Sequence, residues 1–384
     1  MSINSKSTRA LFSLPEDLIY LNGAYMSPNL KAVEQAGIQA IQQKNFPGHF
    51  TVDDFFEPGK ELRQLFAKLV GTSAAERIAI IPSVSYGMAN AAKNIPLKPN
   101  DEILIVGEQF PSNYYIWQRS ADEAGAKIKI VTAPDSLERS KDWNLRILES
   151  IHKGTKVVSM AQVHWADGTL FDLEAIQKRA ASVGAYLVLD LTQSLGAMPF
   201  SLEKIKADVV VCAAYKWLMG PYSIGAAYYS ERFDHGVPIE ESWINRLGSD
   251  DFSQLVNYES NHRPGARRYE VGEASNFILL PMMIEGLKQI FEWGPENIQS
   301  YTDEISRDCV LHLRKQGYRI EDDRYRANHL FGIRIPKDRD VEKLKSNLLK
   351  YKIKVSFRGD ATRVSPNVYN SKKDFDILLD CLTK

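Results

Sequence analysis

The sequence ADVVVCAAYKWLMGPYSIGAAY, residues 207–228, consists of two apolar runs separated by a glycine–proline pair. The first run, 208–212, is rich in β-branched residues and predicts a buried strand, and the pair breaks the backbone before a second run at 224–229. Lys216 follows the first strand. Apolar surroundings should lower its pKa, which is what an amine needs to attack a carbonyl group. On spacing alone, the better interpretation is an ordinary lysine whose stem lies along the strand end while its ammonium group reaches water.

Upstream of this stretch, short apolar runs alternate with helical patterns. The runs from residue 77 onward are RIAII, EILIV, KIKIV, KVVSMAQ, YLVLD and DVVVCA, and helices are predicted at 84–94, 113–124, 143–152 and 172–183. This rhythm is typical of a mainly parallel sheet with helices on both faces. Right-handed crossovers bring the carboxyl ends of such strands to one edge, where ligands bind, so the residues just after each strand matter most.

The flanking segments divide the chain into two predicted domains. Helices are expected at 30–44, 58–70, 276–292, 296–316, 339–350 and 371–382, and further strands near 318–320, 330–335 and 353–357. We assign residues 21–295 to a large α/β domain. Residues 1–20, as an N-terminal arm, and 296–384, as an α+β unit, form the small domain.

Composition argues for a small-molecule partner. Acidic and basic residues balance at 48 each, without long runs of one sign, so neither nucleic acid nor a membrane surface is an expected partner. No apolar run approaches the roughly 20 residues needed to span a bilayer, and no signal sequence is apparent, so we expect a cytoplasmic protein. The three cysteines and seven histidines are scattered, so neither disulfides nor a metal site is expected.

Polar and aromatic residues follow two of the predicted strands. After RIAII, the segment with Ser85 and Tyr86 opens a helix whose free N–H groups could bind an anion, although a simple N-cap is the favoured interpretation. After EILIV, Phe110 could cover a planar ligand and Asn113 could cap the next helix. Taken alone, the aromatic signal is weak, because most such rings fill the core.

Two further strand ends carry candidate residues. His164 and Trp165 follow KVVSMAQ and could line the crevice, but packing against the loop is the favoured interpretation. Asp190 closes a fully apolar strand, so its carboxylate needs a cationic or N–H partner; capping of the following turn is the equally weighted alternative. Gln193 could point into the same crevice.

Taken together, these residues favour pyridoxal phosphate as the cofactor. Lys216 would form the Schiff base, Asp190 would keep the pyridinium nitrogen protonated, and Ser85 with Tyr86 would hold the phosphate. Tyr215, beside the lysine, is also assigned to the cofactor pocket. None of these residues alone is specific for pyridoxal phosphate, but their combination is.

The chain resembles the class V aminotransferases, the fold-type I pyridoxal-phosphate group that includes cysteine desulfurases, isopenicillin N epimerase-like proteins and kynureninases. The match runs from YLNGAYMSP to SPNVYN and is strongest in the spacing of Asp190, Gln193 and Lys216. The resemblance implies a seven-stranded, mainly parallel sheet and a small C-terminal α+β domain. It also implies a homodimer with each active site at the interface.

Several roles are carried over by position. Gln193 would approach the phenolic oxygen of the cofactor, and Phe110 would stack on its ring. Within FRGDATRVSPNVYN, Arg363 takes the position that binds the substrate carboxylate, and Arg358 is a second candidate. Two residues of the N-terminal turn, Asn22 and Gly23, are assigned to the substrate side of the site.

The sequence also departs from the family. Trp165 stands where asparagine is frequent, and Glu273 stands where a threonine of the partner-facing loop is usual, so Ser275 or a backbone amide could replace that contact with the phosphate. The segment KVSFRGDATR lacks the mobile-loop cysteine of desulfurases, which disfavours persulfide transfer.

We therefore predict an enzyme that acts on an amino acid through Lys216, foremost an aminotransferase with an amino acid and possibly a keto acid as substrates. A lyase, an epimerase or a kynureninase-like hydrolase is the alternative, because the shared residues do not separate these reactions. A non-catalytic sensor of the cofactor is disfavoured, because the sequence shows no DNA-binding extension or basic patch and retains the lysine.

Overall fold

A seven-stranded sheet forms the centre of the large α/β unit. The computed structural model describes residue 3, residues 5–136 and residues 138–383, and the strands lie in the order β2-β8-β7-β6-β5-β3-β4. Only β8 is antiparallel to its neighbours. The strands are β2 (Ile78–Ile81), β3 (Glu102–Val106), β4 (Lys127–Val131), β5 (Thr155–Ala161), β6 (Tyr186–Asp190), β7 (Val209–Ala213) and β8 (Gly225–Tyr229). The predicted α/β fold with a mainly parallel seven-stranded sheet is thus confirmed.

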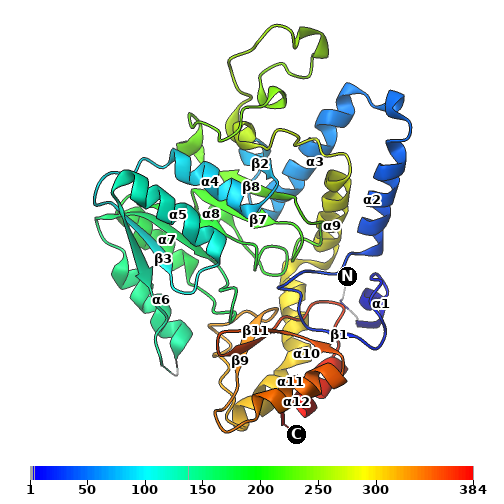
Figure 1. Ribbon diagram of the computed structural model, residues 1–384, viewed down its shortest axis with the longest axis vertical. Coiled ribbons are helices and arrows are strands. Elements are labelled where there is room, and N and C mark those ends of the chain that lie inside the picture. The colour runs from blue at the N-terminus through cyan, green and yellow to red at the C-terminus, as the bar shows by residue number, and fades with distance from the viewer. Residues whose placement is uncertain (1–2, 4, 137, 384) are drawn as a thin grey trace.

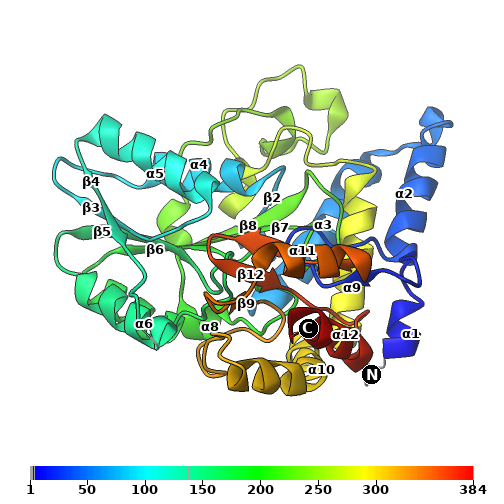
Figure 2. The same ribbon diagram turned by 60° about the horizontal axis from the view of Figure 1, so that its bottom comes forward.

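Helices cover both faces of this sheet, as Figure 2 shows for α4 and α5 on one side and α6 on the other. Because side chains alternate along a strand, Ile80 and Leu104 pack into the core under α3, α6, α7 and α9, whereas Ala79 and Ile103 pack into the core under α4 and α5. The helices of this part are α2 (Lys31–Gln43), α3 (Val52–Val70), α4 (Val84–Asn94), α5 (Pro111–Ala124), α6 (Arg139–Ser150), α7 (Leu173–Ser182), α8 (Leu202–Ile205) and α9 (Leu279–Trp293).

A second, smaller unit lies at the foot of the molecule in orange and red (Figure 1). Its antiparallel sheet has the order β11-β12-β9, and it has a core of its own that also takes in Ile19 and Leu21. On this ground we propose that the N-terminal arm belongs to the small domain, although residues 1, 2, 4, 137 and 384 of the predicted domain ranges lie outside the described residues. Its elements are α1 (Ser5–Arg9), β1 (Ile19–Tyr20), α10 (Pro295–Lys315), β9 (Phe331–Arg334), α11 (Val341–Lys350), β10 (Ile353–Lys354), β11 (Ser356–Arg358), β12 (Ala361–Val364) and α12 (Lys372–Thr383).

Three local predictions were wrong. The helix expected from residue 58 begins at Val52, because the N–H and hydroxyl of Thr51 both donate to Asp54 and start the helix ahead of Pro58. The strand expected at 318–320 is a single bridge between Arg319 and Arg334. Strand β12 was not predicted, although β2 and β9, which are equally short, were. None of the helices in the described part of the chain is long and apolar enough to cross a membrane.

A buried carboxylate joins the two units. Asp167, in the loop after β5, lies 3.3 Å from Nη2 of Arg139 on α6 and 2.9 Å from Nη2 of Arg334 on β9. Nδ1 of His164 lies 3.1 Å from the same carboxylate, and the backbone carbonyl of Asp167 accepts from the N–H of Gly332. Burial opposes ionisation, but the interactions with His164, Arg139 and Arg334 hold the pKa of Asp167 below its usual range. We call this cluster the Asp167 clasp.

Replacing Asp167 by asparagine should destabilise the protein by about 3–5 kcal/mol, because two arginines would then lack their buried partner. Since the pKa of Asp167 is depressed in the folded state, the stabilisation is present above the ordinary aspartate pKa of about 4 and is lost as the pH falls towards the folded-state value. Urea unfolding from pH 7 down to pH 3 measures both effects. Asp376→Asn, which removes an exposed pair with Lys372, should cost less than about 1 kcal/mol. Equal losses of unfolding free energy in the two variants would contradict the stabilising role of the Asp167 clasp.

Candidate active site

A cavity of about 270 Å³ lies at the carboxyl edge of the central sheet. Strand β2 runs parallel to β7 because both are antiparallel to β8, so β2, β3, β5, β6 and β7 all end at this edge. Seven predicted site residues line the cavity: Ser85, Phe110, Trp165, Asp190, Gln193, Tyr215 and Lys216. The sheet therefore brings together residues that are up to 131 positions apart in the chain, from Ser85 to Lys216 (216 − 85).

Lys216 lies in the turn after β7 and is only 7% exposed. Burial lowers the pKa of its ammonium group to about 8, while the nearby carboxylate of Asp190 acts in the opposite direction. Nζ lies 5.8 Å from the centre of the Phe110 ring and 5.3 Å from that of Tyr215. Within the described structure, Lys216 and Asp190 form no ion pair. The amine is therefore held in an apolar cavity and is partly neutral near physiological pH.

Asp190 ends β6, directly beside β7 in the sheet. Its Oδ1 accepts from the N–H of Thr192 at 2.9 Å and its Oδ2 from the side-chain amide of Asn113 at 2.8 Å. These two donors compensate for the burial of the carboxylate. The prediction that Asn113 caps α5 was wrong: Phe110 occupies the N-cap position, and Asn113 turns inward to Asp190.

The start of α4 faces the cavity. Ser83 is the N-cap and accepts from the N–H of Tyr86 at 3.2 Å, which matches the N-cap interpretation. Val84 and Ser85 line the cavity at the first turn of the helix, where free N–H groups and the helix dipole favour an anion. The hydroxyl of Tyr86 donates to Glu240 at 2.9 Å, away from the cavity. The phosphate role of Ser85 and Tyr86 stays a prediction, and the Tyr86 hydroxyl is already bound to Glu240.

His164 and Trp165 take different places. His164 is 1% exposed and lies between Asp167 and the carbonyl of Glu108, so packing, not ligand contact, describes its position. Trp165 lines the cavity, donates to the same carbonyl at 2.7 Å and packs edge-on against Phe110 with ring centres 5.6 Å apart. The cavity assignment was wrong for the histidine and agrees with the position of the tryptophan.

Gln193 lines the cavity and its side chain is held by two hydrogen bonds. Its Nε2 donates to the carbonyl of Ala24, and its Oε1 accepts from the indole of Trp217.

The sequence did not single out three further cavity residues, Gln109, Thr192 and Tyr222. Their one available signal was nearness to a strand end or to Lys216, which many structural residues share.

Arg363 on β12 is buried, and only part of its guanidinium group has a partner. Nη1 donates to the carbonyl of Trp165 at 2.8 Å, whereas Nε and Nη2 are buried without any partner in the described structure. Burial and the neighbouring Arg358 lower its pKa to about 10, so it stays charged at neutral pH. The other buried arginines of the described chain all pair with carboxylates: Arg63 with Glu270, Arg139 with Asp167, and Arg326 with Asp323. Arg363 is therefore arranged for an anion from outside the chain.

The N-terminal turn lies next to this arginine. Oδ1 of Asn22 accepts from the hydroxyl of Ser356 at 2.8 Å, and Ser356 is paired with Arg363 across the β11–β12 hairpin. Gly23 lies against Trp217, where a Cβ atom would be 3.2 Å from the indole ring. The structure thus places Asn22 near Arg363 and Gly23 beside Ala24, which binds Gln193, but neither Asn22 nor Gly23 lines the cavity.

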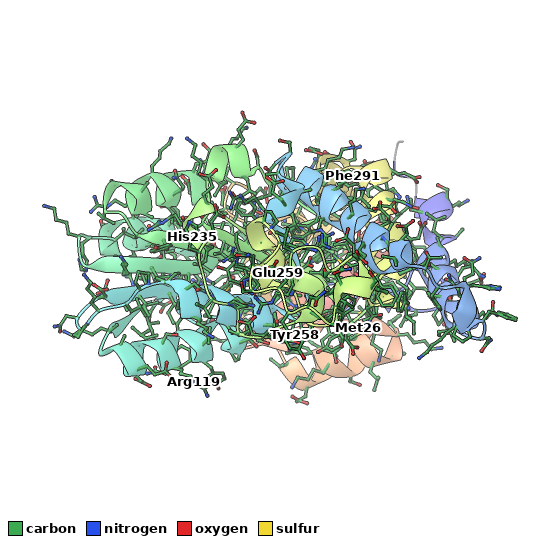
Figure 3. All side chains as sticks on the ribbon, turned by 90° about the horizontal axis from the view of Figure 1, so that it is seen from above. Met26, Arg119, His235, Tyr258, Glu259 and Phe291 are labelled. Carbon is green, nitrogen blue, oxygen red and sulfur yellow. The ribbon has the colours of Figure 1, made fainter. Side chains whose placement is uncertain are left out.

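Another cavity lies in the projecting segment at the top of Figure 1. It measures about 640 Å³ and is lined by residues of 241–259, none of which follows a strand of the sheet. Figure 3 views this segment from above, with Tyr258 and Glu259 labelled. No group of three metal-ligating side chains occurs among the described residues. The sheet edge around Lys216 is therefore the candidate active site.

The model of the family described as aminotransferase class-V matches residues 30–374. The chain belongs to the class-V aminotransferase family. The resemblance stated from the sequence is thus confirmed, and the protein is a pyridoxal-phosphate-dependent enzyme of a family that has aminotransferase and lyase members.

Individual relatives are distant but extend over most of the chain. An uncharacterized aminotransferase of Bacillus subtilis (strain 168), YcbU, is 22% identical over 319 residues, covering 83% of this chain and 81% of that protein. Isopenicillin N epimerase of Streptomyces clavuligerus is 20% identical over 331 residues, covering 84% and 83%. The solved structure of a C-DES variant with glycine covalently linked to the PLP cofactor has a TM-score of 0.87 at 16% identity, covering 97% of this chain and 98% of that one.

The residues at the sheet edge fit pyridoxal phosphate. Lys216 supplies a buried amine of lowered pKa, Asp190 supplies a carboxylate for the ring nitrogen, and Phe110 supplies an aromatic face. The first turn of α4, with Ser85, supplies N–H and hydroxyl donors for a phosphate group. Glu273, which stands where a threonine is usual, is exposed and does not line this cavity.

In the cofactor-free protein, Lys216 should react with an amine-directed reagent with an apparent pKa of about 8, because the neutral amine is the nucleophile. Exposed lysines should follow the ordinary pKa of about 10.4. Asp190→Asn should move the midpoint for Lys216 to lower pH, since the carboxylate raises its pKa, whereas Asp376→Asn should not. Peptide mass spectrometry across pH 6–11 measures each lysine separately. A Lys216 midpoint equal to that of exposed lysines would contradict the assignment.

Proposed function

We propose that the protein is an aminotransferase that binds an α-amino acid between Lys216 and Arg363. The observation that carries this proposal is the guanidinium group of Arg363, which is buried with Nε and Nη2 unpartnered. A carboxylate oxygen pair suits such a fork, and Trp165 holds the remaining nitrogen in place. The acid group of an amino acid would compensate for the burial of this charge.

The cofactor would be held by residues on three sides. Lys216 would bind it covalently, Asp190 would hold the proton of its ring nitrogen, and the first turn of α4 with Ser85 would hold its phosphate. When bound, pyridoxal phosphate supplies a carbonyl carbon for the amino group of the substrate and a ring that accepts electrons from the α-carbon.

Proton transfer would fall to Lys216. With a pKa of about 8, its amine is near the value at which a group both takes and releases protons at neutral pH. Arg363 would fix the substrate carboxylate, and the aromatic walls from Phe110 and Trp165 would exclude water from the α-carbon. The same lysine could then return the proton to another atom, which is the step that an aminotransferase requires.

Two observations support aminotransferase over persulfide chemistry. The β11–β12 hairpin carries arginine, glycine and aspartate at its turn and no cysteine. All three cysteines are buried, and Cys212 on β7 has its pKa raised well above the usual range, chiefly by burial. We also propose that the protein forms a homodimer, as expected for this family. A keto acid would be the acceptor of the amino group.

The aminotransferase proposal predicts that the amino group passes from an amino acid to a 2-oxo acid without release of ammonia. Wild-type protein with an amino acid and a 2-oxo acid should form a new amino acid and one equivalent of the donor's keto acid, measured by chromatography. Lys216→Ala should lose this activity by at least about 100-fold together with the visible absorbance of the bound cofactor, whereas exposed Lys178→Ala should retain both. Ammonia, sulfide or an inverted amino acid as the main product would overturn the aminotransferase proposal and indicate a lyase or an epimerase.

Arg363→Gln should weaken amino-acid binding about 10- to 100-fold, the range for losing hydrogen bonds to a charged group. Because Arg363 has no carboxylate partner in the described chain, this change leaves no buried charge unpaired. By contrast, Arg63→Gln leaves Glu270 without one partner and should lower the unfolding midpoint. Spectroscopic titration and thermal unfolding separate the two effects. Unchanged amino-acid affinity in Arg363→Gln would show that the carboxylate binds elsewhere.

A further inference from the structure

The hairpin of β11 and β12 carries two arginines on one face. In its antiparallel register, Ser356 lies opposite Arg363 and Arg358 lies opposite Ala361. Opposed residues of an antiparallel pair project to the same side, and so do alternate residues along a strand. Arg358 and Arg363 therefore project from the same face of the hairpin and are diagonal neighbours.

Trp165 connects both arginines to the cavity. The guanidinium carbon of Arg358 lies 5.5 Å from the centre of the Trp165 ring, and Nη1 of Arg363 donates to the carbonyl of the same residue at 2.8 Å. The Trp165 ring packs against Phe110, whose centre lies 5.8 Å from Nζ of Lys216. The two guanidinium groups thus contact a residue that lines the cavity, although neither arginine lines it directly.

Neither arginine is neutralised by the described part of the chain. Arg358 donates from Nη1 to the neighbouring carbonyl of Phe357 at 2.8 Å, and its Nε is buried without a partner. The carboxylate of Asp360, in the same hairpin turn, pairs with Arg334 at 3.2 Å. Two like charges that share one face repel each other, and a single carboxylate on Arg363 would leave Arg358 unpaired.

We propose that the substrate is an acidic α-amino acid, whose α-carboxylate binds Arg363 and whose side-chain carboxylate binds Arg358. This inference rests on the proposed function, because it needs Arg363 to hold the α-carboxylate. Arg358 then selects the substrate: its planar fork matches a carboxylate, while an amide side chain would present N–H groups to a cation that has only donors. Stacking on Trp165 holds that fork at the cavity edge.

The test uses matched pairs of amino acids that differ in charge but hardly in shape. The holoenzyme is titrated with L-aspartate against L-asparagine and L-glutamate against L-glutamine, with the visible spectrum of the cofactor as the readout. We expect one acid to bind about 10- to 100-fold more tightly than its amide. Arg358→Gln should remove this preference by weakening only the acid, and Arg358→Lys should keep part of it. Arg307→Gln, an exposed change on α10, should leave the preference unchanged.

The possible failures are distinguishable. Equal binding of acid and amide by the wild type, or equal weakening of both in Arg358→Gln, would overturn the acidic substrate while leaving the Arg363 test intact. A holoenzyme whose spectrum responds to no amino acid would overturn the proposed function as well. If Arg358→Gln did not fold, as judged by its unfolding midpoint, the wild-type preference and Arg358→Lys would still decide the question.

Discussion

The parallel pairing of β6 with β7 is the constraint on which the site depends. It places the last residue of one strand, Asp190, beside the turn that carries Lys216, although the two are 26 positions apart (216 − 190). Both groups lose most of their contact with water there, and they do not neutralise each other within the described structure. Two N–H donors compensate for the burial of the Asp190 carboxylate, whereas the Lys216 amine is buried without an ion-pair partner in the described structure. Burial lowers the pKa of the amine, and the nearby carboxylate of Asp190 opposes this shift.

The sequence predicts those site residues that the backbone pattern alone positions, but not those whose side-chain direction depends on neighbours from other segments. Asp190 and Lys216 could be found because backbone periodicity alone places them at strand ends. Tyr86 and His164 have the same sequence signal, yet their side chains point to Glu240 and Asp167, because rotamer direction depends on neighbours from other segments. Asn113 was misassigned for the same reason: its partner, Asp190, is 77 positions away. The alternation of strands and helices in a mainly parallel sheet could be predicted, but the direction of individual side chains could not.

The Asp167 clasp illustrates a second limit. It unites α6, the loop after β5 and β9, and no local pattern in the sequence connects these segments. Its consequence reaches the site, because Gly332 donates to the backbone of Asp167 and is paired with Arg363 across β9 and β12. The loop that carries Trp165 is thereby held against the strand that carries Arg363. The fold of the large unit could be predicted without the clasp, but the packing of the Trp165 loop against the strand that carries Arg363 could not.

The charge balance of the buried arginines distinguishes Arg363 from the others in the described chain. Elsewhere in the described chain, buried arginines meet carboxylates, as in the pairs Arg63–Glu270 and Arg326–Asp323, which contribute to holding segments together. Arg363 departs from that pattern, and it contacts Trp165, which lines the cavity around Lys216. An uncompensated buried charge destabilises a fold unless a ligand supplies the missing partner. Under the proposed function, the carboxylate of the substrate supplies the partner that Arg363 lacks in the described chain.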